Sequence, residues 1–346
     1  MKKKILHILN TSSYSGAENV AISIINNMGD RYESAYASLE GPIRNNLKKN
    51  NIVFIPIVRM SISEIRRIIK LFKPDIIHAH DYTASIIVAS SGVKIPIISH
   101  LHNNPPWLKN YNVYSYLYLL STFRYKKVLG VSESIFEEYV FGKKISNKTM
   151  SISNPIDTED IIKKKNCNSE FSASYDVVFL GRLTVQKNPI RFIRIISEMV
   201  IKVPDLQVAM IGDGILRKEC DLMIDQLNLS KNIHLLGFLE NPYEFLSKAK
   251  VLCITSKWEG FGLVAVEALS LGIPVIATPV GGLPGIVDSE CGLLTNDNNE
   301  YAEELYQVLN NEEYRNKKSL KAYIKSGELN NINFYIEKLT DIYENC

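Results

Sequence analysis

The sequence predicts an α/β protein made of two Rossmann-like domains that face each other across a cleft. Short apolar runs alternate with helical patterns along the chain, which is typical of parallel sheets whose strands are joined by helices. A polar and lysine-rich stretch at 161–174 separates two such series. A length of 346 residues is enough for two domains that each bury a core of their own.

The first series predicts the sheet of an N-terminal domain at residues 1–160. It begins after three lysines that mimic a signal peptide, but His7 and Asn10 interrupt the apolar run and favour a strand instead. The expected strands lie at 5–9, 53–56, 76–79, 96–99, 128–131 and 149–152. We interpret residues 161–175 as a linker.

The second series predicts a C-terminal domain at residues 176–330, followed by a helix within 331–346. Its expected strands lie at 177–180, 207–211, 233–235, 251–255 and 274–278. Ligands of open α/β sheets bind beyond the carboxyl ends of the strands. We therefore expect the polar residues that follow these strands to converge in the cleft.

The composition describes a soluble globular protein, with 46% hydrophobic and 22% charged residues. A membrane-spanning helix is not expected, because no run of about 18 uncharged apolar residues occurs. The five cysteines are odd in number and lack the spacing of zinc ligands. This pattern favours the cytoplasm, where thiols stay reduced.

The net charge of +3 conceals an asymmetry between the halves of the chain. Residues 1–150 hold 20 Lys and Arg against 10 Asp and Glu, whereas residues 151–346 hold 20 against 27. Basic residues gather at 63–73 and in a tyrosine-rich stretch at 111–127. Two interpretations stay open: a surface for an anionic membrane leaflet, which would place the protein on the inner face of the cell membrane, or solvated helices above core tyrosines. Nucleic acid is not an expected partner.

Two glutamates, Glu259 and Glu267, mark the most informative segment, residues 256–282. Glu259 follows a predicted strand, and Glu267 lies about one turn into a predicted helix. The corner between them leaves backbone N–H groups unpaired at a helix start, where anions bind. This expected anion seat consists of Gly260, Phe261, Gly262, Leu263 and Val264. The pattern predicts a diphosphate between two carboxylates that each bind sugar hydroxyls.

Two cations, Arg182 and Lys187, follow the first strand of the second domain. A planar guanidinium and a flexible ammonium can grip a diphosphate and neutralise its charge as it leaves. Gly212 ends the next strand, and Gly281 with Gly282 forms a further turn. Both glycine turns let the backbone come close to a ligand.

The first domain contains two His-x-His pairs, His78 with His80 and His100 with His102. Alternate residues of a strand share a face, so each pair could supply two ligands to a metal ion. Asp81 is the only adjacent carboxylate, and no Asp-x-Asp triplet occurs in the chain. The sequence therefore argues against a catalytic metal.

Taken in order, these segments resemble the retaining glycosyltransferases of family 4, in which an E-x7-E motif binds the donor nucleotide sugar. The resemblance covers nearly the whole chain and implies the GT-B fold, in which a C-terminal helix, here within 331–346, returns to the N-terminal domain. Each further match is weak alone, but together they form a specific pattern. They lie at 15–18, 78–81, 99–103, 131–132, 154–157, 181–182, 187–189, 211–214 and 237–238.

The resemblance assigns roles to the domains and to their residues. It implies an acceptor-binding N-terminal domain and a C-terminal domain that binds the nucleotide sugar. His102 matches a histidine that contacts the transferred sugar and helps to stabilise the charged transition state. Arg182 and Lys187 match the cations of the diphosphate site, while His100 is expected to be structural.

The first loop departs from the common family form, which has two adjacent glycines. Ser15 takes the place of the first, and Gly16, which we expect to bind the donor, takes that of the second. A serine can donate a hydrogen bond to a phosphate or an acceptor, but it restricts the backbone. His80, Asp81 and Asn103 are further candidates for the acceptor side, although His80 and Asp81 suit a core or helix-capping role equally well.

We therefore predict a retaining, metal-independent hexosyltransferase that needs no cofactor. It would move a sugar from a nucleoside-diphosphate donor, with UDP favoured, to a glycan or lipid-linked acceptor of a capsule, exopolysaccharide or similar surface polymer. Glu267 would bind the ribose and Glu259 the sugar hydroxyls, while domain closure excludes water. Two alternatives stay open: a GT-B sugar-nucleotide epimerase and a non-catalytic partner subunit that binds nucleotide sugar.

Overall fold

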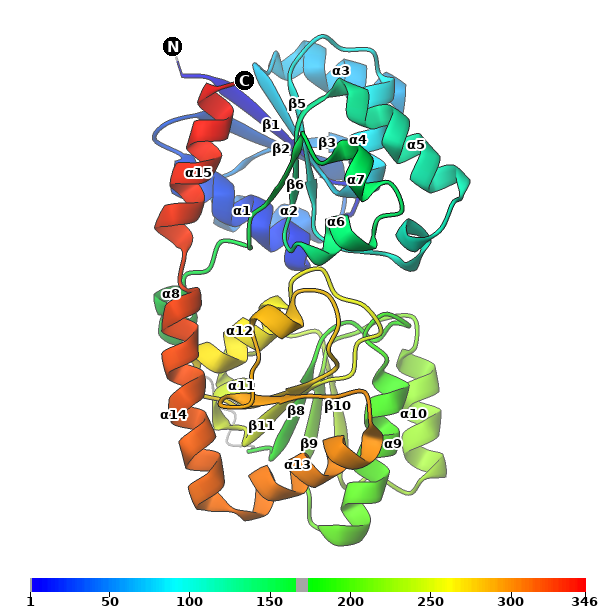
Figure 1. Ribbon diagram of the computed structural model, residues 1–346, viewed down its shortest axis with the longest axis vertical. Coiled ribbons are helices and arrows are strands. Elements are labelled where there is room, and N and C mark those ends of the chain that lie inside the picture. Colours follow the sequence, from blue (N-terminus) through cyan, green and yellow to red (C-terminus); the bar gives the residue numbers. More distant parts are fainter. Residues whose placement is uncertain (1, 166–173) are drawn as a thin grey trace. The chain divides into compact units, whose positions relative to one another are not determined.

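The computed structural model describes residues 2–165 and 174–346, and the chain forms two compact units (Figure 1). Unit 1 comprises Met1–Pro155 and Asn331–Cys346, and unit 2 comprises Ile156–Asn330. Each unit is built on one parallel sheet whose strands are joined by helices. The predicted fold class of two Rossmann-like domains is therefore confirmed.

The sheet of unit 1 has seven strands in the order β3-β2-β1-β4-β5-β6-β7. All of its neighbouring strands pair in parallel. The strands are β1 (Lys4–Ile8), β2 (Glu33–Leu39), β3 (Val53–Ile57), β4 (Ile76–His80), β5 (Ile97–Leu101), β6 (Tyr125–Gly130) and β7 (Thr149–Ser151).

The helices of unit 1 connect these strands, and α15 joins them from the far end of the sequence. They are α1 (Gly16–Met28), α2 (Ile43–Lys49), α3 (Ile62–Phe72), α4 (Asp81–Ser90), α5 (Val113–Ser121), α6 (Ser134–Glu138), α7 (Gly142–Ile145) and α15 (Ile332–Glu344), with the short 3-10 helices η1 (Pro106–Lys109) and η2 (Thr122–Arg124). Tyr343 anchors α15, because its ring is fully buried and its hydroxyl lies 2.6 Å from Nδ1 of His78.

The sheet of unit 2 has six strands in the order β10-β9-β8-β11-β12-β13. The strands are β8 (Val177–Leu180), β9 (Val208–Ile211), β10 (Ile233–Gly237), β11 (Val251–Ile254), β12 (Val275–Ala277) and β13 (Gly292–Leu294). The helices are α8 (Thr158–Lys165), α9 (Pro189–Lys202), α10 (Arg217–Gln226), α11 (Tyr243–Lys248), α12 (Leu263–Ser270), α13 (Asn298–Asn310) and α14 (Glu312–Leu329), with the 3-10 helix η3 (Leu283–Gly285). Buried side chains of α9 and α13, such as Phe192 and Leu305, pack with Met210 and Val251 of the sheet.

Two strands lie outside the sequence prediction, β2 and β13. The β2 sequence, ESAYASL, contains alanine and serine in place of a continuous apolar run, yet Tyr36 at its centre is fully buried. The β13 strand has only three residues. Neither segment shows the apolar run on which strand prediction depends.

Two helix starts also differ from the prediction. From the sequence we expect a helix that starts near Asn19, but α1 begins at Gly16, and the side chain of Glu18 in its first turn is hydrogen-bonded by Thr11 and Ser15. The predicted linker at 161–175 starts inside α8, while residues 166–173 lie outside the described residues. In α8 the lysines pair with acidic residues one turn earlier, Lys163 with Glu159 and Lys164 with Asp160, and such pairs support a helix.

Both sheets reverse their strand order beside the first strand of the unit, between β1 and β4 in unit 1 and between β8 and β11 in unit 2. Such a switch point separates the loops that follow the two central strands and is where open α/β sheets bind ligands. None of the helices in the described residues is long and apolar enough to cross a membrane.

Candidate functional site

Two loops of unit 2 meet at its switch point and are tied together by hydrogen bonds. The loop after β8 carries Arg182 and Lys187, and the loop after β11 carries Glu259. The backbone N–H of Lys257 donates to the carbonyl of Gln186 at 2.7 Å, and the Gln186 amide donates to the carbonyl of Trp258 at 3.1 Å. The sequence prediction that these loops converge is thus correct within unit 2.

Lys187 and Glu259 form a largely buried ion pair at the centre of this assembly. The Glu259 side chain is only 7% exposed, and its Oε1 also accepts a hydrogen bond from the Ser256 hydroxyl at 2.6 Å. An ammonium has three N–H donors, and Glu259 takes one of them. Lys187 therefore holds Glu259 in place and keeps donors for a second anion.

The Gly281-Gly282 turn packs directly on the backbone of the Glu259 loop. A Cβ on Gly281 would lie 1.9 Å from the carbonyl oxygen of Glu259, and a Cβ on Gly282 would lie 2.6 Å from that of Phe261. The N–H of Gly282 donates to the carbonyl of Gly260 at 3.0 Å. Gly281 also has a φ of 59°, which favours glycine. No other residue type permits this close approach.

Helix α12 starts at the predicted glycine corner. Gly262 is its N-cap residue with a φ of 105°, and a Cβ there would lie 2.7 Å from the Leu283 side chain. The first amide to bond within the helix is that of Ala265, which donates to the Gly262 carbonyl at 2.9 Å. The amides of Leu263 and Val264 precede this bond, so the N-terminus of α12 retains the character of an anion site.

Glu267 lies in the second turn of α12, where the sequence predicts it. The hydroxyl of Tyr243 donates to its Oε1 at 3.2 Å. Burial raises the pKa of Glu267, while the Tyr243 hydrogen bond opposes this rise. Glu267 is half-buried, and a carboxylate with one protein donor has acceptor capacity left for hydroxyl groups of a ligand.

Arg182 and Gly212 follow neighbouring strands and are positioned by close backbone contact. The N–H of Gly181 donates to the Ile211 carbonyl at 3.0 Å, and a Cβ on Gly212 would lie 2.1 Å from the Gly181 carbonyl oxygen. The Arg182 side chain is exposed and donates to the side-chain oxygen of Gln186 at 3.3 Å. Arg182 is thus an exposed cation of this loop pair, unlike Lys187.

Five histidines form a buried network at the centre of the unit 1 sheet. His7 lies on β1, His78 and His80 on β4, and His100 on β5, while His102 follows β5. Nδ1 of His7 lies 3.1 Å from Nε2 of His80, and Nδ1 of His80 lies 2.8 Å from Nε2 of His102. A second branch joins Tyr343, His78 and His100. The predicted site histidine is therefore the end of a chain of rings.

The network fixes the protonation of its members. Burial lowers the pKa of His7 and of His102 to about 3, and it lowers the pKa of His80 in the same way. Each neutral ring carries one N–H, which it can donate to the bare nitrogen of the next ring. The tautomer of one ring along His7, His80 and His102 therefore determines the tautomer of its neighbour. Nδ1 of His102 is buried and has no hydrogen-bond partner among the described residues. Contact of His102 with a ligand remains a prediction.

The same histidines include two groups with the spacing of metal ligands. Nitrogens of His7, His78 and His80 lie within 4.8 Å of one another, as do those of His80, His100 and His102. Ring-to-ring hydrogen bonds already account for the short distances. The absence of a catalytic metal remains a prediction.

The candidates for the acceptor side have structural roles in unit 1. His80 is 1% exposed and lies behind His102. Asp81 starts α4 and accepts a hydrogen bond from the backbone N–H of His102 at 3.0 Å, while Asn103 accepts one from the N–H of Asn104. Ser15 donates to Glu18, and Gly16 is the first residue of α1. Contact of His80, Asp81, Asn103 and Ser15 with an acceptor remains a prediction, and so does contact of Gly16 with the donor.

The structure adds residues that sequence reasoning did not place in the site. Ser256 donates a hydrogen bond to Glu259, and Tyr243 donates one to Glu267. Gln186 joins the loop after β8 to the loop after β11. Glu18, in the first turn of α1, is 2% exposed and holds the preceding loop through Thr11 and Ser15. Only Glu18 had a signal, because it ends the matched stretch at 15–18. The partners of the two glutamates come from contacts that sequence spacing does not reveal.

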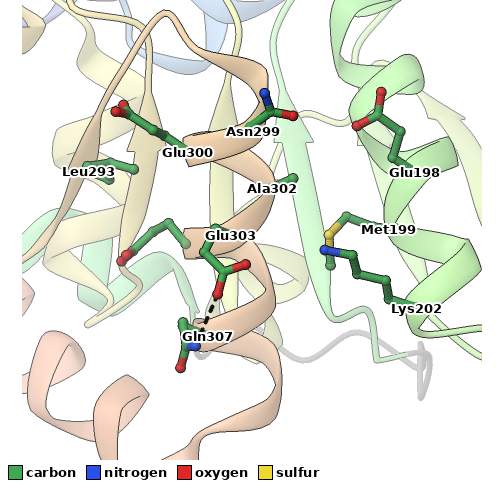
Figure 2. A pocket seen from close by; sticks show the side chains of 10 residues that line it. Glu198, Met199, Lys202, Leu293, Asn299, Glu300, Ala302, Glu303 and Gln307 are labelled. Atoms are coloured by element: carbon green, nitrogen blue, oxygen red, sulfur yellow. Dashed lines mark hydrogen bonds between the residues drawn. The ribbon is translucent and has the colours of Figure 1, made fainter.

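A hollow of about 660 Å³ lies elsewhere in unit 2, between α9 and α13 (Figure 2). Its lining includes four carboxylates, those of Glu198, Glu300, Glu303 and Glu304. An acidic lining repels a diphosphate. The hollow is therefore a poor alternative to the loops at the switch point.

We predict that Gly281→Ala destabilises unit 2 more than Gly285→Ala does. The added methyl group would collide with the Glu259 carbonyl, whereas a Cβ on Gly285 meets nothing within 4 Å. We expect a loss of roughly 1–3 kcal/mol, the range for strained backbone positions. Thermal unfolding of both variants measures it, and equal midpoints would contradict the packing argument.

We also predict that unit 1 loses stability in mild acid. The pKa of His7 and of His102 is about 3 in the folded chain against an ordinary 6.5, so the stabilisation is complete above pH 6.5 and is lost as the pH falls toward 3. Each such histidine should cost about 1.4 kcal/mol between pH 7.5 and pH 5.5, because only the unfolded chain binds the proton.

Urea unfolding of a Trp258→Phe background measures this effect, because Trp107 then reports on unit 1 alone. His7→Asn should flatten the dependence on pH, whereas His234→Gln, in unit 2, should leave it unchanged. Unfolding that is independent of pH in this range would show that the network is not buried as described.

Two family models together match most of the chain. The model described as Glycosyltransferase Family 4 matches residues 11–160, and the model described as Glycosyl transferases group 1 matches residues 160–325. Anabaena Alr3699/HepE, solved in complex with UDP-glucose, has the same fold, with a TM-score of 0.87 at 19% identity over 99% of this chain and 100% of that one.

Relatives with closer sequences include proteins of archaea and bacteria. An uncharacterized glycosyltransferase of Methanocaldococcus jannaschii is 32% identical over 250 residues, which are 70% of this chain and 67% of that protein. The GalNAc-alpha-(1->4)-GalNAc-alpha-(1->3)-diNAcBac-PP-undecaprenol alpha-1,4-N-acetyl-D-galactosaminyltransferase of Campylobacter jejuni is 30% identical over 263 residues, 72% of this chain and 69% of that enzyme. An O-antigen biosynthesis glycosyltransferase of Escherichia coli, WclY, is 25% identical over 83% of each chain. With its two Rossmann-like units and these relatives, the chain belongs to the glycosyltransferases of family 4 and has their GT-B fold.

Proposed function

We propose that this glycosyltransferase moves a sugar from a UDP-sugar to a hydroxyl group of a lipid-linked or growing surface polysaccharide, with retention of configuration and without a metal ion. The observation that carries the proposal is that a cation loop meets the Glu259 loop at the switch point of unit 2, and that this second loop leads into the N-terminus of α12, which carries the half-buried Glu267. Each of these groups matches one part of a nucleoside-diphosphate sugar.

The donor would bind along the path from Glu267 to Glu259. Glu267 takes the two ribose hydroxyls, the amides of Leu263 and Val264 take the diphosphate, and Glu259 takes hydroxyls of the sugar. Arg182 and the remaining N–H donors of Lys187 neutralise the phosphate oxygens. These roles follow the resemblance and are compatible with the exposure and hydrogen bonding of each residue.

In the proposed transfer reaction, the protein supplies charge stabilisation and positions the two substrates. The acceptor oxygen forms a bond to the anomeric carbon on the face from which the diphosphate departs, and the acceptor proton passes to a departing phosphate oxygen. Negative charge then develops on the diphosphate, beside Arg182, Lys187 and the α12 amides. Electrostatic groups placed where charge develops lower the barrier most.

The donor and acceptor classes are supported by the names of similar proteins. The Anabaena neighbour was solved with UDP-glucose, the Campylobacter relative is named for an acceptor linked to PP-undecaprenol, and the Escherichia relative for O-antigen biosynthesis. An acceptor with a polyprenyl tail is presented at a membrane surface. We therefore propose that the enzyme works as a peripheral protein on the inner face of the cell membrane.

We predict that Glu267→Gln weakens the binding of a UDP-sugar at least tenfold, because an amide replaces a carboxylate that accepts two hydroxyl protons. Binding to the unmodified chain should also weaken as the pH falls through the raised pKa of Glu267, since the protonated form accepts less well. Calorimetry with UDP-, GDP-, ADP- and dTDP-sugars measures both effects. Glu303→Gln, in the acidic hollow of Figure 2, is the matched control.

Saturable binding of a different nucleotide sugar would correct the donor class. No binding of any donor, or equal binding by Glu267→Gln, would remove the assigned site. Binding with conversion of the donor sugar and no transfer to any acceptor would establish an epimerase in place of a transferase.

We predict that Arg182→Ala lowers kcat by a factor that corresponds to roughly 2–4 kcal/mol, the usual effect of removing one group that stabilises transition-state charge. Arg194→Ala, an exposed arginine of α9, should leave turnover unchanged. Release of UDP in the presence of acceptor measures both variants. Excess EDTA should not change the rate of the unmodified enzyme, and a rate that falls with EDTA and returns with a divalent cation would refute metal-independent transfer.

A further inference from the structure

Helix α5 of unit 1 has an inverted distribution of side chains. Its buried positions are occupied by Ser115, Tyr118 and Ser121, whereas most of its large aliphatic side chains face outward. A surface helix of a globular protein normally buries its apolar stripe and exposes its polar one. The inversion shows that packing within unit 1 does not explain the apolar residues of α5.

Hydrogen bonds on the buried side hold α5 in this orientation. The hydroxyl of Tyr118 lies 2.9 Å from that of Ser99 on β5, and the Tyr125 hydroxyl of β6 donates to the Ser121 hydroxyl at 2.7 Å. The Tyr139 hydroxyl donates to the Ser115 carbonyl at 2.6 Å. Rotation of the helix to bury its apolar side would break these bonds and strand buried polar groups.

The outward side of α5 and its flanks forms a continuous apolar stretch that we call the α5 face. Phe123 is 77% exposed and Leu120 is 62% exposed. The residues of the α5 face are Tyr111, Val113, Tyr114, Tyr116, Leu117, Leu120 and Phe123. Single exposed apolar residues are ordinary, but contiguous apolar surface marks a site of interaction. Of the two interpretations that the sequence left open for 111–127, the core explanation holds only for Tyr118 and Tyr125.

The charge around the α5 face is positive. No acidic residue occurs between positions 82 and 132, a span with five lysines and arginines. Arg124 and Lys126 are exposed at the C-terminal end of the helix, and Lys144 lies 5.2 Å from the ring of Phe141, which packs against Tyr116. The nearby acid Glu138 is already paired with Lys109. Other exposed acids, Glu133 and Glu137, lie on or beside α6, after β6.

The other basic stretch of unit 1, on α3, exposes fewer large apolar side chains, Ile62 and Leu71. On α3, Arg67 pairs with Glu64 at 2.9 Å, and Arg66 donates to the Ser91 carbonyl at 2.9 Å. Its cations are therefore partly used within the fold. At α5, apolar exposure coincides with the positive charge of Lys126 and Lys144, and Arg124 adds its charge while it donates to the Val93 carbonyl.

We propose that the α5 face is the surface by which this enzyme docks on an anionic lipid bilayer, with its aliphatic and aromatic side chains at the level of the headgroups and the flanking lysines and Arg124 on the lipid phosphates. Tyrosines and basic residues around an apolar stripe are the composition of interfacial helices. A second copy of this chain fits less well, because two such faces would bring like charges together. The proposed function, with its lipid-linked acceptor, explains why the enzyme would dock on a membrane. The docking itself needs no substrate.

Flotation of the full chain with lipid vesicles tests the proposal. We expect binding to phosphatidylcholine vesicles that contain phosphatidylglycerol, little binding to phosphatidylcholine alone, and loss of binding as salt rises, because the Debye length shortens. The double variant Leu120→Ser with Phe123→Ser should lower the bound fraction at least tenfold. Lys126→Gln with Lys144→Gln should lower it at low salt and reduce its salt dependence.

A matched control removes equally exposed apolar residues from unit 2, Ile201→Ser with Ile215→Ser, and should bind as the unmodified chain does. Unchanged thermal unfolding midpoints exclude misfolding of the variants. Equal loss in the control pair, binding that does not depend on anionic lipid, or no binding at all would overturn the proposal. So would a dimer in the absence of lipid that the α5 variant dissociates, because the face would then join two copies.

Donor affinity measured on the same samples separates this inference from the proposed function. Vesicle binding without donor binding would support the α5 face and refute the assigned donor site. Donor binding without vesicle binding would refute the α5 face and leave the donor site intact.

Discussion

Backbone packing at the switch point of unit 2 is the constraint on which the candidate site depends. The carbonyl of Glu259 faces Gly281, and the carbonyl of Gly181 faces Gly212, at distances that leave no room for a Cβ. These backbone contacts determine the positions of the side chains on the loops, because the loops cannot move independently. Glu259, Lys187 and the start of α12 are thus set by glycine geometry before any ion pair forms, and the salt bridge refines a position that the backbone already defines.

The two units reach their chemistry through opposite electrostatics. Unit 2 places full charges at its sheet edge, with a carboxylate and an ammonium in contact. Unit 1 places neutral imidazoles at its centre, and burial holds the pKa of His102 at about 3. At neutral pH His102 therefore carries no charge, so its predicted contribution to a charged transition state is that of a hydrogen-bonding dipole. Its tautomer, and hence whether Nδ1 donates or accepts, is tied to His80 and His7 through the ring chain.

The fold and the meeting of the loops after β8 and β11 could be predicted from the sequence because they depend on local patterns, whereas the donor roles of the residues on these loops remain predictions. Buried parallel strands appear as apolar runs, and glycine corners with a carboxylate on either side keep a fixed spacing. The strand β2 was not predicted, because its buried residues around Tyr36 are mostly alanine. The His7–His80–His102 chain was not predicted for a different reason. The register of three neighbouring strands brings together residues that are 73 and 22 positions apart, and spacing along the sequence does not reveal such contacts.

The buried ion pair also determines how each cation of the donor site can be probed. Lys187 is the partner of a carboxylate that is 7% exposed, so removing it would leave Glu259 uncompensated in a dry environment. A loss of activity after such a change would mix three causes: a displaced loop, a repelled diphosphate and a missing phosphate contact. Arg182 is exposed and bonds only weakly to the Gln186 side chain at 3.3 Å, so its removal leaves no buried charge unpaired. The effect of Arg182 on turnover therefore tests the proposed charge stabilisation at the diphosphate directly, whereas the effect of Lys187 can be interpreted only after the position of Glu259 has been established in the variant.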